Sequence, residues 1–303
     1  MEWNHQFIET NGIRMHLVRH GAGHPVVLLH GWPEFWYTWR KNIPTLAEQF
    51  DVIAPDLRGF GQSDKPRGTA SEAYTIDHHV EDLKGLIDAL GLPRIGLVSH
   101  DVGSSVAQAF TRRYPDRVTG LFFFNVLYPG VAQRLAGPEN MTETWYQGFH
   151  QQPWAADLIG SSRAATRIYF GNMLSHWAHD PRTFDDDLEA WVDNFLAPGN
   201  LQGGFNWYTA IFPARLAMMR GDGAAPPPIP HPTRVRWGAS EPFMKPDYAD
   251  RLGETFTDLD YAVVPEAGHF VHYEQPDFTN REIAGFFGGL AAAGRFTPTI
   301  AES

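Results

Sequence analysis

Short runs of apolar residues alternate with amphipathic stretches up to residue 126 and again after residue 232. Alternating apolar and polar positions at 6–9 and 14–18, on either side of Asn11-Gly12, predict an opening β-hairpin. Apolar runs typical of strands buried on both faces predict buried strands at 25–29, 95–98 and 118–126. Further strands are expected at 51–55, 233–237 and 259–264. Helical periodicity predicts helices at 36–49, 75–90, 104–114, near Tyr248 and at 277–290. Strands that alternate with helices imply a parallel sheet with helices on both faces.

The pattern changes after Tyr128-Pro-Gly130. From there to about Arg220 the segments have a helical period, are rich in aromatic residues and contain no convincing strand. A proline-rich connector at 224–232, stiff and extended, closes this region. The sequence therefore predicts an α/β core formed by residues 1–128 and 221–303, interrupted by a helical cap at 129–220.

Composition narrows the class of protein. A formal net charge of −11 argues against nucleic acid or an anionic membrane as a partner. The chain has no cysteine, which excludes disulfides and thiolate metal sites, and no histidine spacing in the cap indicates a metal. The first residues, Met1–His5, lack the features of a signal peptide, and no apolar run reaches the length of a membrane-spanning helix. We therefore expect a soluble, cytoplasmic protein.

A sharp corner follows the predicted strand at 95–98. The sequence Ser99-His100-Asp101-Val102-Gly103 has small residues two positions before and two positions after Asp101, as a tight strand-to-helix elbow requires. In such an elbow the central residue has a strained backbone and its side chain projects above the sheet. The usual central residue is serine, so the aspartate found here restricts the chemistry.

Two further candidates follow predicted strands, Glu241 after 233–237 and His269 after 259–264. Open α/β sheets place their sites at the carboxyl ends of the strands. The chain order Asp101, Glu241, His269 matches the nucleophile, acid, histidine order of α/β-hydrolases. The alternatives are that Asp101 caps a helix, that His269 is an ordinary loop histidine, and that Glu241 is a solvated carboxylate, with Asp247 as the nearest substitute.

An aspartate nucleophile predicts the type of substrate. A carboxylate that attacks an sp³ carbon forms an ester, which water can then hydrolyse at the carboxyl carbon of Asp101. The substrate is therefore an epoxide or an alkyl halide rather than a carboxylic ester. His269, oriented by Glu241, would act as general base in the second step only. The backbone N–H groups of Trp32 and Val102 are the candidates for an oxyanion hole.

Three motifs carry a family resemblance. They are the loop His30-Gly-Trp-Pro-Glu34, the aspartate-bearing elbow and the late Gly268-His269, and with 36–40 and 54–64 they resemble the epoxide hydrolases of the α/β-hydrolase superfamily over nearly the whole chain. Haloalkane dehalogenases share the signature at 54–64. The resemblance implies that Pro33 shapes the oxyanion hole, that the product is a vicinal diol, that no cofactor is used and that the role is detoxification.

The resemblance also assigns two tyrosines in the cap. Tyr146, in the segment 145–153, and Tyr208, in Asn206-Trp-Tyr208, resemble the tyrosines that activate the epoxide oxygen in this family. The alternative is that either tyrosine only packs the cap. His150, His176 and His179 could then replace it as proton donors.

Some residues depart from the family pattern. Val102 stands where tryptophan is common, which weakens the alternative of a haloalkane dehalogenase, and Val102 and Ser105 cannot hold the carboxylate of a haloacid as arginines would. Glu241 is one methylene longer than the commoner aspartate. A third possibility, of another class, is a catalytically silent ligand-binding protein with this fold.

Five of the ten tryptophans lie between residues 145 and 207, so an apolar pocket and a small hydrophobic epoxide are expected. The candidates for substrate contact are Trp32, Pro33, Trp145, Trp207 and Phe270. Besides this substrate and water, we expect neither nucleic acid nor membrane as a partner. The sequence leaves open whether the chain forms a homodimer.

Overall fold

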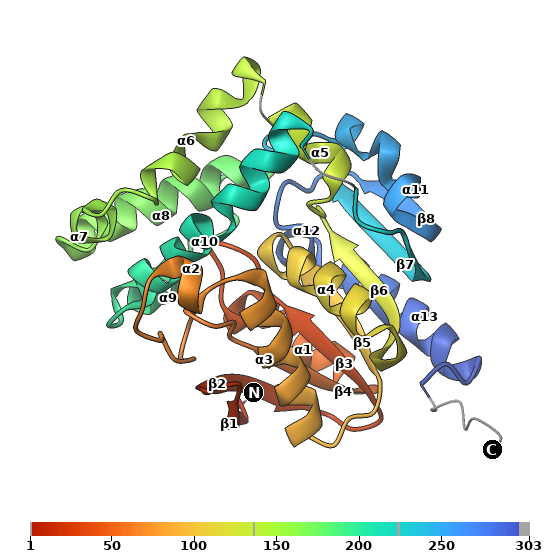
Figure 1. The fold of residues 1–303 in the computed structure, drawn as a ribbon. Coiled ribbons are helices and arrows are strands. Elements are labelled where there is room, and N and C mark those ends of the chain that lie inside the picture. The colour runs from red at the N-terminus through yellow and green to blue at the C-terminus, as the bar shows by residue number, and fades with distance from the viewer. Residues whose placement is uncertain (1, 136, 223–224, 297–303) are drawn as a thin grey trace.

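A computed structural model of the protein describes residues 2–135, 137–222 and 225–296. Its eight strands form one sheet in the order β1-β2-β4-β3-β5-β6-β7-β8 (Figure 1). The strands are β1 (His5–Thr10), β2 (Ile13–His20), β3 (His24–Leu29), β4 (Phe50–Pro55), β5 (Ile95–His100), β6 (Val118–Phe124), β7 (Ile229–Gly238) and β8 (Phe256–Val264). The strands from β3 to β8 pair in parallel, whereas β1 with β2 and β2 with β4 pair antiparallel.

The opening hairpin is confirmed. Asn11 and Gly12 have φ values of 44° and 76°, which is the left-handed pair that a two-residue hairpin turn needs. The buried strands predicted at 95–98 and 118–126 are also confirmed, since every residue of β5 and β6 is buried, whereas β8 at the edge of the sheet is mostly exposed. The predicted parallel sheet with helices on both faces is therefore the observed fold.

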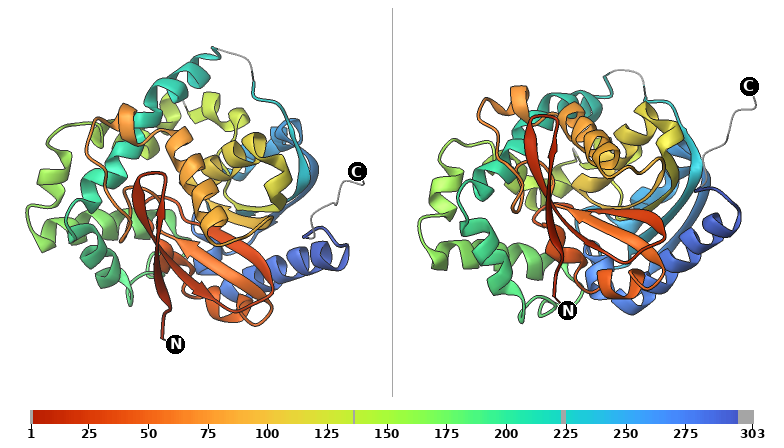
Figure 2. Two further views of the ribbon diagram at one scale, coloured as in Figure 1. Left: turned by 60° about the horizontal axis from the view of Figure 1, so that its bottom comes forward. Right: turned by 90° about the horizontal axis from the view of Figure 1, so that it is seen from below.

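Helices cover both faces of the sheet. α3 (Ile76–Ala89) and α4 (Val102–Arg113) lie side by side on one face, and α1 (Ile43–Leu46) and α13 (Pro276–Ala292) lie on the other (Figure 2). α3 buries Val80, Leu83, Leu86 and Ile87, and each such side chain contributes about 2 kcal/mol when it leaves water. Short elements complete this part of the chain: η1 (Trp36–Trp39), α2 (Ala70–Ala73), η2 (Pro115–Arg117), η4 (Pro246–Arg251), α11 (Leu252–Thr255) and α12 (Val271–Glu274).

Between β6 and β7 the chain forms helices, and no strand occurs among the described residues of this stretch. We call residues 129–220 the helical insert. It contains α5 (Pro129–Leu135), η3 (Pro138–Asn140), α6 (Met141–Phe149), α7 (Ala155–Ile159), α8 (Arg163–Trp177), α9 (Leu188–Leu196) and α10 (Asn200–Arg220). Figure 1 shows α6, α7 and α8 on one side of the molecule, with α10 running beside them toward α5. None of the helices in the described part of the chain has the length and apolar character needed to cross a membrane.

Two predicted elements need correction. The helix expected at 36–49 is instead the short turn η1 followed by α1, because Pro44 has no N–H to donate and sits at the start of a new helix. Part of the expected connector at 224–232 belongs to a strand, since β7 already begins at Ile229. Ala224 itself, like Met1, lies outside the described residues.

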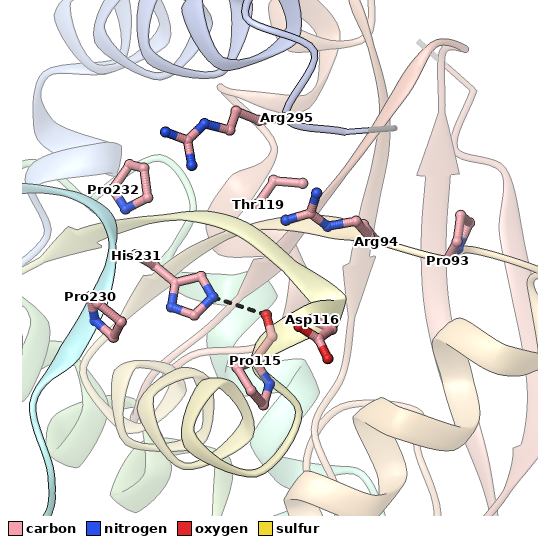
Figure 3. Close-up of a pocket in the computed structure, with 9 residues that line it drawn as sticks. All are labelled: Pro93, Arg94, Pro115, Asp116, Thr119, Pro230, His231, Pro232 and Arg295. Atoms are coloured by element: carbon pink, nitrogen blue, oxygen red, sulfur yellow. Dashed lines mark hydrogen bonds between the residues drawn. The ribbon is translucent and has the colours of Figure 1, made fainter. Parts of the chain in front are cut away.

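A surface hollow of about 570 Å³ lies at the amino-terminal edge of the parallel strands (Figure 3). It is lined by Pro93, Arg94, Pro115, Asp116, Thr119, Pro230, His231, Pro232 and Arg295. The His231 ring spans it, with Nε2 2.9 Å from the carbonyl oxygen of Pro115. Sites of open parallel sheets lie at the opposite, carboxyl-terminal edge, and the sequence-predicted residues lie there.

Candidate active site

The predicted elbow is present between β5 and α4. Asp101 has φ 45° and ψ −113°, a conformation that a residue with a side chain adopts only under strain. Two glycines make the corner sterically feasible. A Cβ on Gly103 would lie 2.5 Å from the carbonyl oxygen of Leu29, and a Cβ on Gly31 would lie 2.5 Å from Cβ of Asp101. The loop after β3 can therefore approach the side chain of Asp101.

That approach brings a backbone donor to the aspartate. The N–H of Trp32 donates to Oδ1 of Asp101 at 2.9 Å. Val102 is the first residue of α4, so its N–H belongs to the group of donors that have no partner inside the helix. The loop carrying Trp32 is also tied to the helical insert, because Nε1 of Trp191 donates to the carbonyl oxygen of Pro33 at 2.8 Å. The two candidates for the oxyanion hole thus flank Asp101.

His269 and Glu241 form a buried pair. Nδ1 of His269 lies 2.5 Å from Oε2 of Glu241, and Oε1 of Glu241 accepts from the N–H groups of Phe243 (2.9 Å) and Met244 (3.2 Å). The longer side chain of Glu241 therefore reaches the histidine. Asp247, the alternative acid, is exposed in η4.

The charge of this pair has a consequence for protonation. Burial lowers the pKa of His269, but the Glu241 carboxylate, its hydrogen bond and the charge of Asp101 act more strongly in the other direction and bring it to about 9. His269 thus carries a proton at neutral pH. Any reaction that neutralises Asp101 removes one of the charges that hold this proton.

Tyr146 of α6 and Tyr208 of α10 meet above Trp32. The Tyr146 ring stacks on the indole of Trp32 with centroids 5.2 Å apart and planes inclined by 7°. The Tyr208 ring meets both edge to face, at 5.6 Å from Trp32 and 5.6 Å from Tyr146. Burial chiefly, and the nearby charge of Asp101, raise the pKa of both tyrosines far above the ordinary value. Both hydroxyls therefore carry their protons at neutral pH and can donate.

The remaining candidates for substrate contact separate into two groups. Phe270 is fully buried and its ring lies 5.1 Å from His269, so it is part of the same cluster as Trp32. Trp145, however, is 48% exposed on the outer side of α6. Trp207 is buried, but against His79 of α3 at 5.1 Å rather than against Trp32. The structure therefore does not bring Trp145 and Trp207 to Asp101.

The three cap histidines also differ in position. His150 is buried, edge to face with Trp32 at 4.5 Å, and its Nε2 lies 2.6 Å from the hydroxyl oxygen of Tyr169. Burial holds the pKa of His150 well below its ordinary value. His176 pairs with Glu143 on the surface, and His179 contacts Ser240. Of the three, only His150 has ring contacts with both tyrosines, at 5.4 Å from Tyr146 and 4.8 Å from Tyr208.

One cluster beside the elbow was not predicted. The buried carboxylate of Glu34 accepts from the N–H of Gly31 (2.6 Å), from Nδ1 of His100 (2.7 Å) and from the hydroxyl of Thr38 (2.6 Å), and lies 3.2 Å from Nε2 of His272. Burial would raise the pKa of Glu34, but the two histidines hold it well below the usual range. These ligand atoms lie within 4.8 Å of one another, a spacing that a metal ion could also use. The signal was available, since Glu34 directly follows the His30–Pro33 motif and His100 directly precedes Asp101.

Trp177 is a second residue that the sequence did not single out. Its ring lies 5.2 Å from His269 and 5.1 Å from Tyr146. Together with Tyr146 it forms the inner wall of a hollow of about 260 Å³ between α6 and α8. Glu143 and His176, which also line this hollow, face each other across it at 2.9 Å.

Comparisons with known proteins agree with this geometry. The family model described as the alpha/beta hydrolase fold matches residues 24–276. The soluble epoxide hydrolase of Corynebacterium sp. (strain C12) is 33% identical over 95% of this chain and 99% of its own length. Epoxide hydrolase 4 of Homo sapiens is 29% identical over 92% of this chain and 77% of its own.

Solved structures give the same result. The epoxide hydrolase CorEH superposes with a TM-score of 0.84 at 31% identity, covering 95% of this chain and all of that one. A mutant of an epoxide hydrolase from Bacillus megaterium, complexed with its naphthyloxy-propanediol product, superposes with a TM-score of 0.81 at 25% identity, covering 93% of this chain and all of that one. The chain therefore belongs to the α/β-hydrolase fold family and, within it, to the epoxide hydrolases.

Proposed function

We propose that the protein hydrolyses a hydrophobic epoxide to a vicinal diol through a covalent ester of Asp101. The observation that carries this proposal is the meeting of Tyr146 and Tyr208 above Trp32, whose backbone N–H holds Asp101. Two proton donors close to one carboxylate are what the opening of a neutral three-membered ether ring requires.

In the first step a carboxylate oxygen of Asp101 attacks one ring carbon. The bond between this carbon and the ring oxygen breaks, and its electron pair goes to the oxygen. Tyr146 or Tyr208 donates a proton to that oxygen as the charge develops. The result is a hydroxyalkyl ester of Asp101 and a tyrosinate.

In the second step His269 removes a proton from water, and the hydroxide attacks the carboxyl carbon of Asp101. The N–H groups of Trp32 and Val102 stabilise the oxyanion that forms. When the intermediate collapses, the diol oxygen takes a proton from His269, and the remaining proton of the water returns to the tyrosinate. Esterification neutralises Asp101, which lowers the pKa of His269 when the histidine must act as a base.

The helical insert acts in this proposal as a cap, the role predicted for residues 129–220, over the core formed by 1–128 and 221–303. The insert supplies the two tyrosines and the core supplies Asp101, Glu241 and His269. Phe270, Trp32 and Trp177 provide the apolar walls, which favour a hydrophobic substrate.

One observation bears on a halide leaving group. The indole Nε1 of Trp32 is buried and has no hydrogen-bond partner among the described residues, as a halide-binding donor would be. This edge of the ring, however, packs against α10, where a Cβ on Gly204 would lie 3.5 Å from Nε1. The relatives and solved structures reported above are epoxide hydrolases, which favours epoxide opening over dehalogenation.

The test is a single turnover of styrene oxide in ¹⁸O-water with enzyme in excess. The proposed ester requires the label to enter the Asp101 carboxylate, because the first diol released takes its new oxygen from the enzyme. Label in the diol instead would indicate direct attack by water and contradict the ester. Halide release from haloalkanes without diol formation from a panel of epoxides would replace the proposed reaction with dehalogenation.

A further inference from the structure

Three arginine side chains are buried among the described residues, and two of them are paired. Arg58 donates to both carboxylate oxygens of Asp82, at 2.7 and 2.6 Å, and Arg236 donates to Glu282 at 2.7 Å. Arg215 of α10 is only 8% exposed, yet its Nη2 is buried without a hydrogen-bond partner and no described carboxylate forms an ion pair with it. A guanidinium nitrogen buried without a hydrogen-bond partner destabilises a fold, so its presence calls for an explanation.

The position of Arg215 in α10 relates it to the candidate active site. It follows Tyr208 by seven residues, which is two helical turns, so both residues lie on the same face of the helix. That face is the one on which Tyr208 meets Trp32 and Tyr146. At 1.5 Å per residue, Arg215 is about 10 Å farther along the axis, toward the end of α10 that lies beside α5 (Figure 1).

Electrostatics places the guanidinium near both hydroxyl groups. Burial is the largest influence on the pKa of Tyr146 and Tyr208 and raises both. The charge of Arg215 acts against this rise at both tyrosines. Arg215 is therefore close enough to both tyrosines for its charge to act on their hydroxyls.

We propose that Arg215 binds an anionic group of the substrate, and that the preferred substrate is an apolar epoxide with a carboxylate at a distance from the oxirane ring. The carboxylate would supply the counter-charge that Arg215 lacks and accept two parallel N–H bonds from its planar guanidinium. This inference rests on the proposed function and deepens it, since it names the substrate class.

The same geometry limits where the carboxylate sits. Two helical turns separate Arg215 from the tyrosine that would touch the ring oxygen, so the anionic group and the oxirane are joined by a chain of several carbon atoms. Trp32, Phe270 and Trp177 offer apolar surface for that chain. Terminal epoxides of medium-chain fatty acids have this form, whereas an oxirane that carries its carboxylate directly does not.

The first experiment compares each epoxy acid with its own methyl ester, which has the same oxirane and lacks the charge. Wild-type protein should hydrolyse the acid with a kcat/KM about 10 to 100 times that of the ester. Arg215→Met should lose this preference, with activity on the ester within about threefold of wild type. Arg215→Lys keeps the charge without the planar guanidinium, so its preference for the acid should lie between those of the wild type and Arg215→Met.

Arg220→Met is the matched control, because it removes one positive charge from the exposed end of the same helix. It should keep the preference for the acid. An equal loss on acid and ester in Arg215→Met would overturn the proposal, since Arg215 would then act through the tyrosines. A wild-type protein without preference for the acid would overturn it as well.

A binding measurement separates this inference from the proposed function. A medium-chain fatty acid without an oxirane, such as decanoate, should raise the melting temperature of the wild type and of Arg220→Met but not of Arg215→Met. Equal shifts in all three proteins would overturn the proposed role of Arg215. Because the shift does not depend on hydrolysis, it tests Arg215 even if the chain hydrolyses no epoxide.

Discussion

The carboxylates of the candidate site in the α/β core and two buried polar side chains of the helical insert differ in their hydrogen bonding. In the core each carboxylate has its donors already in place: Asp101 accepts from Trp32, and both oxygens of Glu241 have partners. In the insert, Nδ1 of His150 and Nη2 of Arg215 are buried without partners among the described residues. The carboxylates of the candidate site are thus held ready for a reaction on Asp101, whereas these two atoms of the insert are open to a ligand. Reaction chemistry and substrate choice are therefore assigned to different regions.

The largest effect is expected when the nucleophile of the core is replaced. Asp101→Asn keeps the shape and tolerates the positive φ of 45°, but its amide does not displace an epoxide oxygen. Diol formation should fall by about 10⁴-fold or more, measured by chromatography of the product. An unchanged thermal unfolding curve would show that the fold is intact, and residual activity within tenfold of wild type would refute the role of Asp101.

The next comparison sets one region directly against the other. His269→Gln should slow turnover by about 1000-fold and leave the ester intact, which adds the mass of the epoxide to the whole protein. A variant with both Tyr146→Phe and Tyr208→Phe should slow turnover by a similar factor without any adduct, because ring opening itself fails. An adduct in the tyrosine variant, or none in the histidine variant, would reverse the assignment of steps to regions.

A smaller effect is expected at the acid of the core. Glu241→Gln keeps a hydrogen bond to His269 but removes a negative charge. In the wild type this charge raises the pKa of His269 and so counteracts the effect of burial, which lowers it. Turnover should fall by about 10- to 100-fold through slower ester hydrolysis, while the rate of ester formation is retained. Rapid-quench measurement of the alkyl-enzyme separates the two rates. Equal slowing of both would assign Glu241 to structure alone.

The smallest effect is the pH dependence of the unmodified protein. The pKa of His269 is raised to about 9 while Asp101 is charged, and it falls once the ester neutralises that charge. Ester hydrolysis needs neutral His269, so its rate should rise with pH up to this lowered pKa, by about tenfold per pH unit. The alkyl-enzyme should therefore accumulate toward acidic pH. A hydrolysis rate that stays level down to about pH 5, below the ordinary histidine pKa, would contradict the role of His269 as base.

Much of the core of the site could be predicted from the sequence. Asp101, Glu241 and His269 each follow a predicted strand, and parallel strands bring their carboxyl ends to one edge. Local residue types were sufficient there because the sheet fixes their relative positions. The prediction of one helix at 36–49 was wrong, and the reason is local too. Pro44 interrupts any helix that would continue through it.

The insert was less predictable because neighbouring residues on a helix point about 100° apart. Trp145 and Trp207 directly precede the two tyrosines, so when the tyrosines face Trp32 these tryptophans face elsewhere. The Glu34 cluster was missed for another reason. Its members come from the loop after β3, the end of β5 and α12, which are far apart in the chain, and only the fold brings His272 to Glu34. Arg215 was also missed, because the sequence does not show that its side chain is buried.

One backbone contact constrains how such proteins can be recombined. The N–H of His269 donates to the carbonyl oxygen of Trp177 at 2.8 Å, and a Cβ on Gly268 would lie only 2.3 Å from that same oxygen. The end of α8 is therefore built against the histidine itself. A chimaera that takes its insert from a relative must inherit residues 177–179 and 268–269 from one parent, or the graft will displace His269. Exchange of α6 and α7 alone, which leaves this junction untouched, is the safer route to new specificity.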